Sequence, residues 1–426
     1  MNGKDLEKVR LWEAPHIGEK APEQIPEAQD FCEGYKTFLN EGKTERECVK
    51  KAVTLLENAG YQKFDPKASY KAGDKIYWNN RKKAIIASTI GTKDLNEGLR
   101  MNGAHIDSPR LDLKPNPLFE KDEIAYLKPH YYGGIRKYQW GTVPLSMHGV
   151  VVKADGEVVE ISIGENEGDP QFCVTDLLPH LASEQNGRKL AEGLKGEELN
   201  IIIGSIPYHD EENEKIKNPA KLLAMKLLNE RYGITEKDFT RAEIEMVPAY
   251  KAVDIGLDRG LVGSYGQDDR VCAYTALMAE IGTKNPEHTT FTILTDKEEI
   301  GSVGNTGLHS DYVHHAVEDL AESFGADTKT VLRHSICLSS DVNAAYDPTF
   351  ASVYESRNSS YVNKGCVLTK YTGARGKSGS SDASAETMAK VIGIMEENGV
   401  YWQTGELGAV DAGGGGTIAQ YVAMMD

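Results

Sequence analysis

The sequence contains few cysteines, and none of them lies close to another. The six, at positions 32, 48, 173, 272, 337 and 366, form no Cys-x-x-Cys pair, so neither a disulfide framework nor a thiolate zinc ribbon is indicated. Apolar runs are also short, because none approaches the ~18 residues that a membrane-spanning helix needs. The N-terminus, which reads Met-Asn-Gly-Lys-Asp-Leu-Glu-Lys, lacks the apolar segment of a signal peptide. We therefore expect reduced thiols and a cytoplasmic location.

Basic residues are in deficit, with 48 Lys and Arg against 65 Asp and Glu and a net charge of −17. This excess of negative charge argues against nonspecific binding to nucleic acid and against anionic membranes. A phosphate loop is also missing, because residues 373–378 read Gly-Ala-Arg-Gly-Lys-Ser and bring the first glycine too close to the second. The composition therefore favours a soluble enzyme with no nucleic-acid or membrane partner.

The 426 residues are too many for one ordinary core and suggest two or three domains of roughly 150 residues each. The first 60 or so residues are typical of helices, and Thr44 with Glu47 predicts a capping box. Apolar runs at 84–91, 99–104, 290–294 and 335–339 predict buried strands of an α/β sheet.

Residues from about 110 to 250 have a different character. Two β-rich runs at 150–163 are joined by Asp155 and Gly156, a strong hairpin signal that predicts antiparallel pairing. The segments 131–134, rich in Gly and Tyr, and 210–215, rich in charge, suggest exposed loops.

These patterns predict an α/β fold. A catalytic, mostly parallel sheet with helices on both faces would be formed by residues 1–107 and 251–426. An inserted β-rich domain at residues 108–250 would interrupt it. Such an insert could cap a site, mediate dimerisation and assembly, or be a decorative insertion.

An acidic stretch at 295–302 follows the strand predicted at 290–294 and contains Glu298 and Glu299. Ligands bind at the carboxyl ends of strands in open α/β sheets. Because successive side chains of a strand alternate, we expect one glutamate to ligate a metal while the other faces the reacting atoms. The alternative is a solvated acidic turn.

Further candidates follow other predicted elements. His105 and Asp107, two residues apart after a strand, would share a face, so that Asp107 could orient the imidazole; the alternative is a surface turn before Ser-Pro. Asp268 and Asp269 open a predicted helix, where capping explains only one of the two. Asp341 adds a carboxylate after the strand at 335–339.

One imidazole and several carboxylates, without thiolate, are ligands suited to zinc, manganese or cobalt. A carboxylate that bridges two ions about 3.5–4 Å apart makes a co-catalytic pair, for which hydrolysis is the natural chemistry. One glutamate would then serve as general base toward water.

Four motifs, at 103–109, 267–270, 296–302 and 340–343, together resemble the M18 family of metallo-aminopeptidases. The resemblance implies a metal-dependent aminopeptidase that uses two divalent ions to act on peptides. Zinc is the expected metal, and manganese or cobalt are the alternatives. It implies that Glu298 is the general base, that Asp107 orients His105 and that Asp268 bridges the two ions. The implied metal ligands are His105, Asp268, Glu299 and Asp341.

The same resemblance implies a catalytic domain interrupted by a β-rich domain and a homo-oligomer, a dodecamer with active sites facing an interior chamber. Two alternatives remain: a related two-metal deacylase or carboxypeptidase, and a catalytically silent assembly protein of the same fold.

The family's remaining metal ligand is a histidine in a Ser-Met-His motif, but this chain has no histidine after His334. We expect a truncated chain; the alternative is an under-ligated second metal position. For an acidic substrate residue, Lys370, Arg375 and Lys377 could supply positive charge or could be solvated surface residues. His180 could reach a neighbouring subunit's site or be structural.

Overall fold

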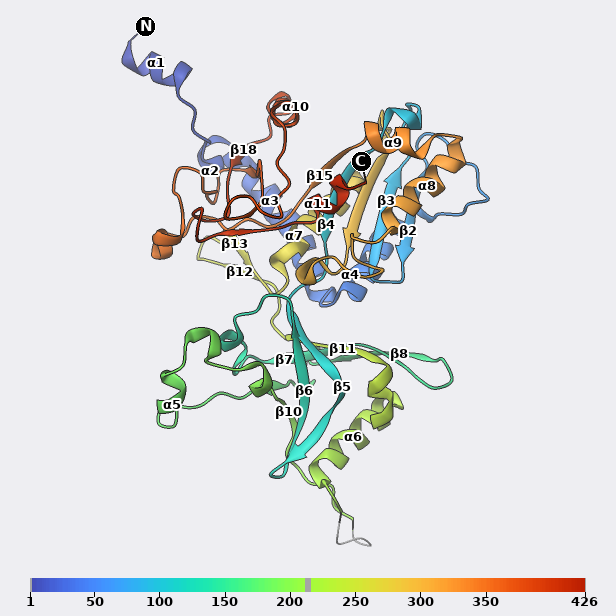
Figure 1. The fold of residues 1–426 in the computed structure, drawn as a ribbon, viewed down its shortest axis with the longest axis vertical. Coiled ribbons are helices and arrows are strands. Elements are labelled where there is room, and N and C mark those ends of the chain that lie inside the picture. Colours follow the sequence, from blue (N-terminus) through green and yellow to red (C-terminus); the bar gives the residue numbers. More distant parts are fainter. Residues whose placement is uncertain (1, 211–215, 426) are drawn as a thin grey trace.

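The computed structural model describes residues 2–210 and 216–425 and has a mixed α/β fold. Figure 1 shows two bodies joined by a narrow waist. The upper body holds a six-stranded sheet with helices on it, and the lower body holds a seven-stranded sheet with α6.

The six-stranded sheet has the order β1-β2-β3-β14-β4-β15. Its strands are β1 (Gln62–Lys63), β2 (Lys75–Asn80), β3 (Ala84–Thr89), β4 (Arg100–His105), β14 (Thr290–Thr295) and β15 (Ile336–Ser339). β4 runs parallel to β14 on one side and to β15 on the other, whereas β3 is antiparallel to β2 and β14. The strands predicted at 84–91, 99–104, 290–294 and 335–339 are thus confirmed. Because β4, β14 and β15 are parallel, their carboxyl ends lie at one edge of the sheet.

Helices pack on both faces of this sheet. One face packs against α3 (Ile25–Glu41), α4 (Glu45–Asn58) and α7 (Gln267–Gly282), and the other against α8 (Tyr312–Phe324) and α9 (Thr328–His334). Neighbouring residues of a strand serve opposite faces, since Leu294 packs with the first group and Ile293 with the second. The predicted capping box is present, because the Thr44 side chain accepts from the Glu47 N–H and the Glu47 carboxylate accepts from the Thr44 N–H.

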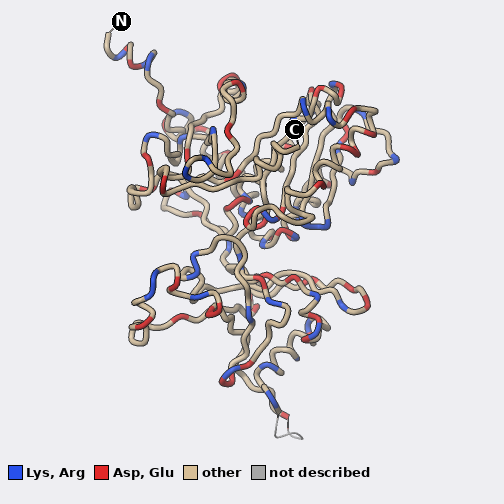
Figure 2. Tube along the Cα trace, in the orientation of Figure 1, with Lys and Arg blue, Asp and Glu red and all other residues tan. Residues whose placement is uncertain are grey.

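The remaining elements of the upper body are short or peripheral. The helices are α1 (Gly3–Arg10), α2 (Ile17–Lys20), α10 (Ala385–Glu397) and α11 (Ala419–Ala423), and the strand pairs are β12 (Val253–Ile255) with β13 (Leu261–Gly263), β16 (Cys366–Leu368) with β18 (Trp402–Thr404), and β17 (Gly373–Ala374) with β19 (Gly414–Gly415). No helix among the described residues has the length and apolar character required to cross a membrane. Figure 2 shows Lys and Arg interspersed with Asp and Glu over both bodies.

The seven-stranded sheet is antiparallel throughout, in the order β8-β7-β11-β5-β6-β10-β9. Its elements are β5 (Arg110–Lys121), β6 (Ile124–Tyr132), β7 (Leu145–Val152), β8 (Val158–Ile163), β9 (Cys173–Val174), α5 (Ser183–Asn186), β10 (Ile201–Gly204), α6 (Pro219–Tyr232) and β11 (Ala242–Pro248). The predicted hairpin is confirmed as β7 and β8, with Val152 opposite Val158. This body has its own apolar core, which includes Leu111, Leu145 and Met246.

The prediction that residues 131–134 form an exposed loop is wrong in part. Tyr131 and Tyr132 are the last residues of β6, and Tyr132 is only 8% exposed. It is buried because it pairs with Arg110 of β5, whose guanidinium lies 3.8 Å from the centre of its ring. Of the loop predicted at 210–215, residues 211–215 lie outside the described residues.

A buried ionic cluster joins the two bodies around Arg110. Its guanidinium lies 3.5 Å from the Glu45 carboxylate at the start of α4 and 3.2 Å from the Glu245 carboxylate of β11. It also contacts Asp112 at 2.7 Å. Glu45 is fully buried, and Arg110 and Glu245 are nearly so. Glu45 shares Arg110 with Lys83, whose Nζ atom lies 3.0 Å from its carboxylate, whereas Glu245 pairs with Arg110.

We predict that Arg110→Met lowers the free energy of unfolding by about 3–5 kcal/mol, because it leaves the buried Glu245 carboxylate without its cation and Glu45 with Lys83 alone. Urea unfolding followed by circular dichroism measures the change. Arg231→Met is the control: it removes an exposed pair with Asp169 and should change stability by less than about 1 kcal/mol. Equal effects of the two substitutions would contradict this view of the junction.

Candidate metal centre

The candidate residues are collected by the shared direction of three strands. His105 ends β4, Thr295 ends β14 directly beside it, and Ser339 of β15 lies opposite Gly103. The chain that leaves each strand therefore starts from the same edge of the sheet. Asp107, the acidic stretch and Asp341 all follow these strand ends.

Two groups of potential metal ligands form there, and they share His105. In one group His105, Asp268 and Glu299 each have a ligand atom within 4.8 Å of the others, and in the second His105, Asp269 and Asp341 do. The His105 Nε2 atom lies 3.1 Å from Asp268 Oδ1 and 3.9 Å from Asp341 Oδ1. His105 is buried, whereas the Asp268 side chain is half exposed. The cluster is thus open to ligands on the side of Asp268.

Asp107 lies behind the imidazole and is fully buried. The His105 Nδ1 atom is 3.0 Å from the Asp107 carbonyl oxygen and 3.3 Å from its carboxylate. The backbone N–H groups of Glu298 and Glu299 donate to the two carboxylate oxygens at 3.1 and 3.2 Å. Burial would raise the pKa of Asp107, but the hydrogen bond and charge of His105 outweigh it and hold the pKa below its usual value.

Glu298 and Glu299 do not lie on extended backbone. They begin the 3₁₀ turn Glu298–Ile300, which follows Lys297 at a φ of 70°. Strand alternation, expected from the sequence, therefore does not direct these two side chains, because a turn replaces the strand at this point. The Glu298 Oε2 atom lies 3.9 Å from His105 Nε2, and Glu299 belongs to a ligand group, so both face the cluster.

Asp269 was not among the assigned ligands, although the sequence left one of the two aspartates at 268 and 269 unexplained. Helix α7 has Gly266 as its N-cap, without a side-chain cap, so capping accounts for neither aspartate. Asp269 is fully buried, and among the described residues no nitrogen or oxygen donor bonds either of its carboxylate oxygens. A buried carboxylate without a donor is costly. Its place beside His105 and Asp341 offers compensation by a cation.

The raised pKa values of the carboxylates in the cluster also indicate that the site lacks a positive charge. Burial raises the pKa of Asp341 to about 6, of Glu298 to about 7 and of Glu299 to about 8, and neighbouring carboxylates add to this against the lowering effect of His105. Burial lowers the pKa of His105, yet Asp107 and Asp268 raise it well above its usual value. The donors are nitrogen and oxygen, so zinc, manganese or cobalt suits them.

The other candidates, Lys370, Arg375, Lys377 and His180, are exposed. Lys370 and Lys377 share the carboxylate of Asp382, at 2.6 and 2.9 Å. His180 is exposed in the lower body, and its contact with a neighbouring subunit stays a prediction.

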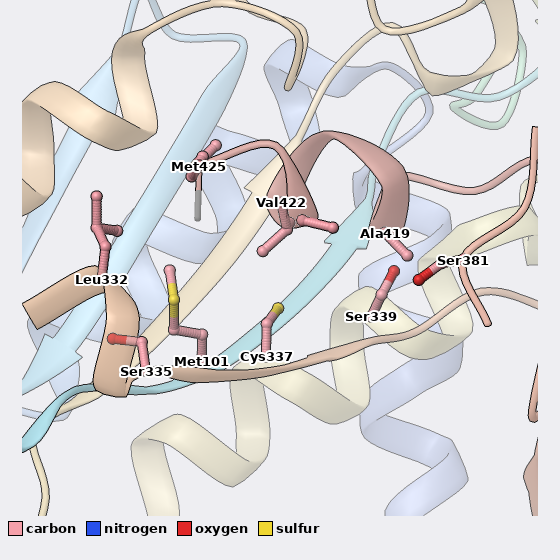
Figure 3. A pocket seen from close by; sticks show the side chains of 10 residues that line it. Met101, Leu332, Ser335, Cys337, Ser339, Ser381, Ala419, Val422 and Met425 are labelled. Carbon is pink, nitrogen blue, oxygen red and sulfur yellow. The ribbon is translucent and has the colours of Figure 1, made fainter. Parts of the chain in front are cut away.

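A cavity of about 210 Å³ lies between β15 and α11. Figure 3 shows its lining, which includes Met101, Leu332, Cys337 and Val422. No member of the two ligand groups lines it, so it is separate from the candidate metal centre.

Nitrogen and oxygen ligands gathered on a mixed α/β fold place the chain in the class of metal-dependent proteins. Comparison with known proteins identifies the family. A family model described as aminopeptidase I zinc metalloprotease (M18) matches residues 38–425. A probable M18 family aminopeptidase 1 of Clostridium acetobutylicum is 49% identical over 94% of this chain and 87% of its own length.

Solved structures agree. The crystal structure of an M18 family aminopeptidase from Thermotoga maritima is similar with a TM-score of 0.93, at 43% identity over 97% of this chain and 91% of that one. The structure of an mApe1 dodecamer from S. cerevisiae shares the fold, with a TM-score of 0.72 at 20% identity over 93% of this chain and 88% of that one.

The chain belongs to the M18 family of zinc metalloproteases, as the four motifs implied. It is a metal-dependent aminopeptidase.

The raised carboxyl pKa values give a prediction for the metal-free protein. Between the ordinary pKa of Glu298 and Glu299 and their raised values of about 7 and 8, the folded state holds more protons than the unfolded state. The contribution of this site to stability should therefore fall as pH rises from 5 to 8. Bound metal should remove that decline, because its charge favours the ionised carboxylates.

The measurement is the thermal unfolding midpoint from pH 5 to 8, with chelator and with saturating Zn²⁺ or Mn²⁺. The stabilisation by metal should be larger at pH 8 than at pH 5. Since all other titrating groups are common to both samples, the difference isolates the site; a stabilisation independent of pH would contradict the assignment.

Proposed function

We propose that the chain is a co-catalytic aminopeptidase that holds two divalent ions, zinc first, with His105, Asp268, Glu299 and Asp341 as ligands and Asp268 as the bridge. The observation that carries the proposal is the gathering of four carboxylates, those of Asp268, Asp269, Glu299 and Asp341, around His105 in two groups. His105 would ligate one of the two ions, because its Nδ1 atom faces Asp107 and leaves Nε2 for a metal. Asp269, which has no nitrogen or oxygen donor among the residues that the structure describes, lies beside His105 and Asp341 and adds a further carboxylate to the second group.

Bound ions of this kind polarise a scissile carbonyl and lower the pKa of a water molecule. The residues of the chain would handle the proton. Glu298, partly buried and with a pKa raised to about 7 by burial, suits a general base that takes a proton from water and returns it to the leaving amine near neutral pH. Asp107 would orient His105, because its carbonyl and carboxylate both lie beside Nδ1.

Peptides with a free N-terminus are the proposed substrates. A carboxylate outside the proposed ligand set, such as that of Glu298, attracts a protonated α-amino group and repels an α-carboxylate. This favours the aminopeptidase over the alternative of a carboxypeptidase, in agreement with the names of the relatives.

We further propose that residues 1–107 and 251–426 form a catalytic domain with a mostly parallel sheet and that residues 108–250, called the insert below, form an inserted β-rich domain. Separate sheets and separate apolar cores support this division. A homo-oligomer, with a dodecamer as its expected form, is proposed from the family resemblance; the yeast dodecamer is a property of that protein. Six free cysteines support a cytoplasmic location.

We predict that Glu298→Gln lowers kcat for release of the N-terminal residue from a short unblocked peptide by about 10²- to 10⁴-fold, the usual contribution of a general base. Metal content should remain at the wild-type level, because Glu298 is not a proposed ligand. Glu287→Gln, at an exposed residue paired with Lys93, should retain wild-type activity.

The blocked form of the same peptide tests the substrate class. N-acetylation should abolish cleavage by the wild type, because it removes the charge of the α-amino group. Cleavage of the acetylated peptide at a rate similar to that of the free one would favour the deacylase alternative, and metal binding without any hydrolysis would favour the silent assembly protein.

A further inference from the structure

The insert touches the candidate metal centre of its own chain through the end of β6. The Tyr132 hydroxyl donates to Asp107 Oδ2 at 2.7 Å, and both side chains are buried. Tyr132 is not among the ligands or the proton-handling residues proposed above, and no feature of the sequence assigned it to the site.

The strand register explains how a residue of the insert reaches Asp107. β5 begins at Arg110, three positions after Asp107, and the antiparallel β6 returns so that Tyr132 lies opposite Arg110. The Arg110 guanidinium stacks at 3.8 Å on the Tyr132 ring and is itself held by Glu45 and Glu245. The stacked guanidinium therefore restricts the orientation of the Tyr132 ring, which gives its hydroxyl a defined position.

Asp107 needs this hydroxyl. Its Oδ1 atom lies by His105 Nδ1 and accepts from the Glu298 N–H, whereas Oδ2 accepts from the Glu299 N–H and from Tyr132. The Tyr132 bond is the shortest of these contacts. Without it, a fully buried carboxylate oxygen would keep one donor at 3.2 Å, and the carboxylate would be less firmly held against the imidazole and the acidic turn.

Gly133 makes a second, separate contact with the centre. It has a φ of +74°, and a Cβ at this position would lie 3.2 Å from both the Cβ and the Oε2 atoms of Glu299. The backbone of the insert thus packs directly against a proposed metal ligand, and a side chain at this position would require Glu299 to shift by a few tenths of an ångström.

We propose that Tyr132 and Gly133 are positioning residues of the metal centre: Tyr132 fixes Asp107, and through it His105, while Gly133 sets the place of Glu299. The inference rests on the proposed function of His105 and Glu299 as ligands. It makes the insert part of the active site of its own subunit, in addition to any role in capping or assembly.

Tyr132→Phe tests the first contact, because it removes the hydroxyl and keeps the ring on which Arg110 stacks. The affinity for Zn²⁺ or Mn²⁺, measured by calorimetric titration against a competing chelator, should fall about 10- to 100-fold, the usual effect of losing a partner behind a metal ligand. At saturating metal, kcat should fall while KM changes less than kcat, since Tyr132 lies behind the centre.

Tyr232→Phe is the matched control. Tyr232 is also in the insert, and its hydroxyl donates at 2.8 Å to the Ser162 carbonyl oxygen, away from the centre. It should retain wild-type metal affinity and kcat. Equal metal affinity and kcat in Tyr132→Phe and Tyr232→Phe would overturn the role of Tyr132.

Gly133→Ala and Gly168→Ala form a second pair that does not depend on the first. Both glycines are in the insert with left-handed φ values of +74° and +85°, but a Cβ at Gly168 would meet nothing within 4 Å. Strain from the left-handed conformation should lower the unfolding temperature of both variants. Only Gly133→Ala should also lose metal affinity, by tenfold or more, through displacement of Glu299.

Equal metal affinity in these two glycine variants would overturn the role of Gly133. Metal affinity is measured without substrate, so the inference is judged separately from peptidase activity. A wild type that binds metal but cleaves no peptide would contradict the proposed function while leaving the positioning contacts to be decided by the titrations.

Discussion

The structure of the site depends on the satisfaction of one buried carboxylate. Asp107 is fully buried, and an ionised carboxylate in that position is tolerated only when donors surround it. Those donors come from three parts of the chain: the end of β4 with His105, the end of β6 with Tyr132, and the backbone of the acidic turn at Glu298 and Glu299. Asp107 therefore holds the two bodies and the acidic turn in one arrangement.

On the other side of the His105 ring from Asp107, carboxylates gather without enough positive charge to compensate them. Burial and mutual repulsion raise the pKa of Glu298, Glu299 and Asp341. Asp269 is buried without a nitrogen or oxygen donor among the described residues. Such a cluster destabilises the protein alone and becomes favourable when a divalent cation joins it. The hydrogen bonds to Asp107 thus offset part of the loss of stability that the uncompensated carboxylates cause.

Many of the site residues could be anticipated because they follow parallel strands closely in sequence. His105 ends β4 and Asp107 follows two residues later, and Glu298, Glu299 and Asp341 come within a few residues of β14 and β15. The alternation expected for Glu298 and Glu299 is absent, since a turn after Lys297 replaces the strand; their separate roles stay a prediction. Local pattern predicts where a strand ends but not the backbone path just beyond it.

The sequence by itself determined the α/β character, the hairpin of β7 and β8, the capping box at Thr44 and the family, because each depends on residues near one another in the chain or on motifs of fixed spelling. Only the tertiary structure decided that Asp269 joins a ligand group, that Tyr132 bonds Asp107 and that Gly133 lies against Glu299. Those contacts arise from strand register and from the junction of two bodies. Register depends on pairing between segments far apart in sequence, which no local pattern encodes.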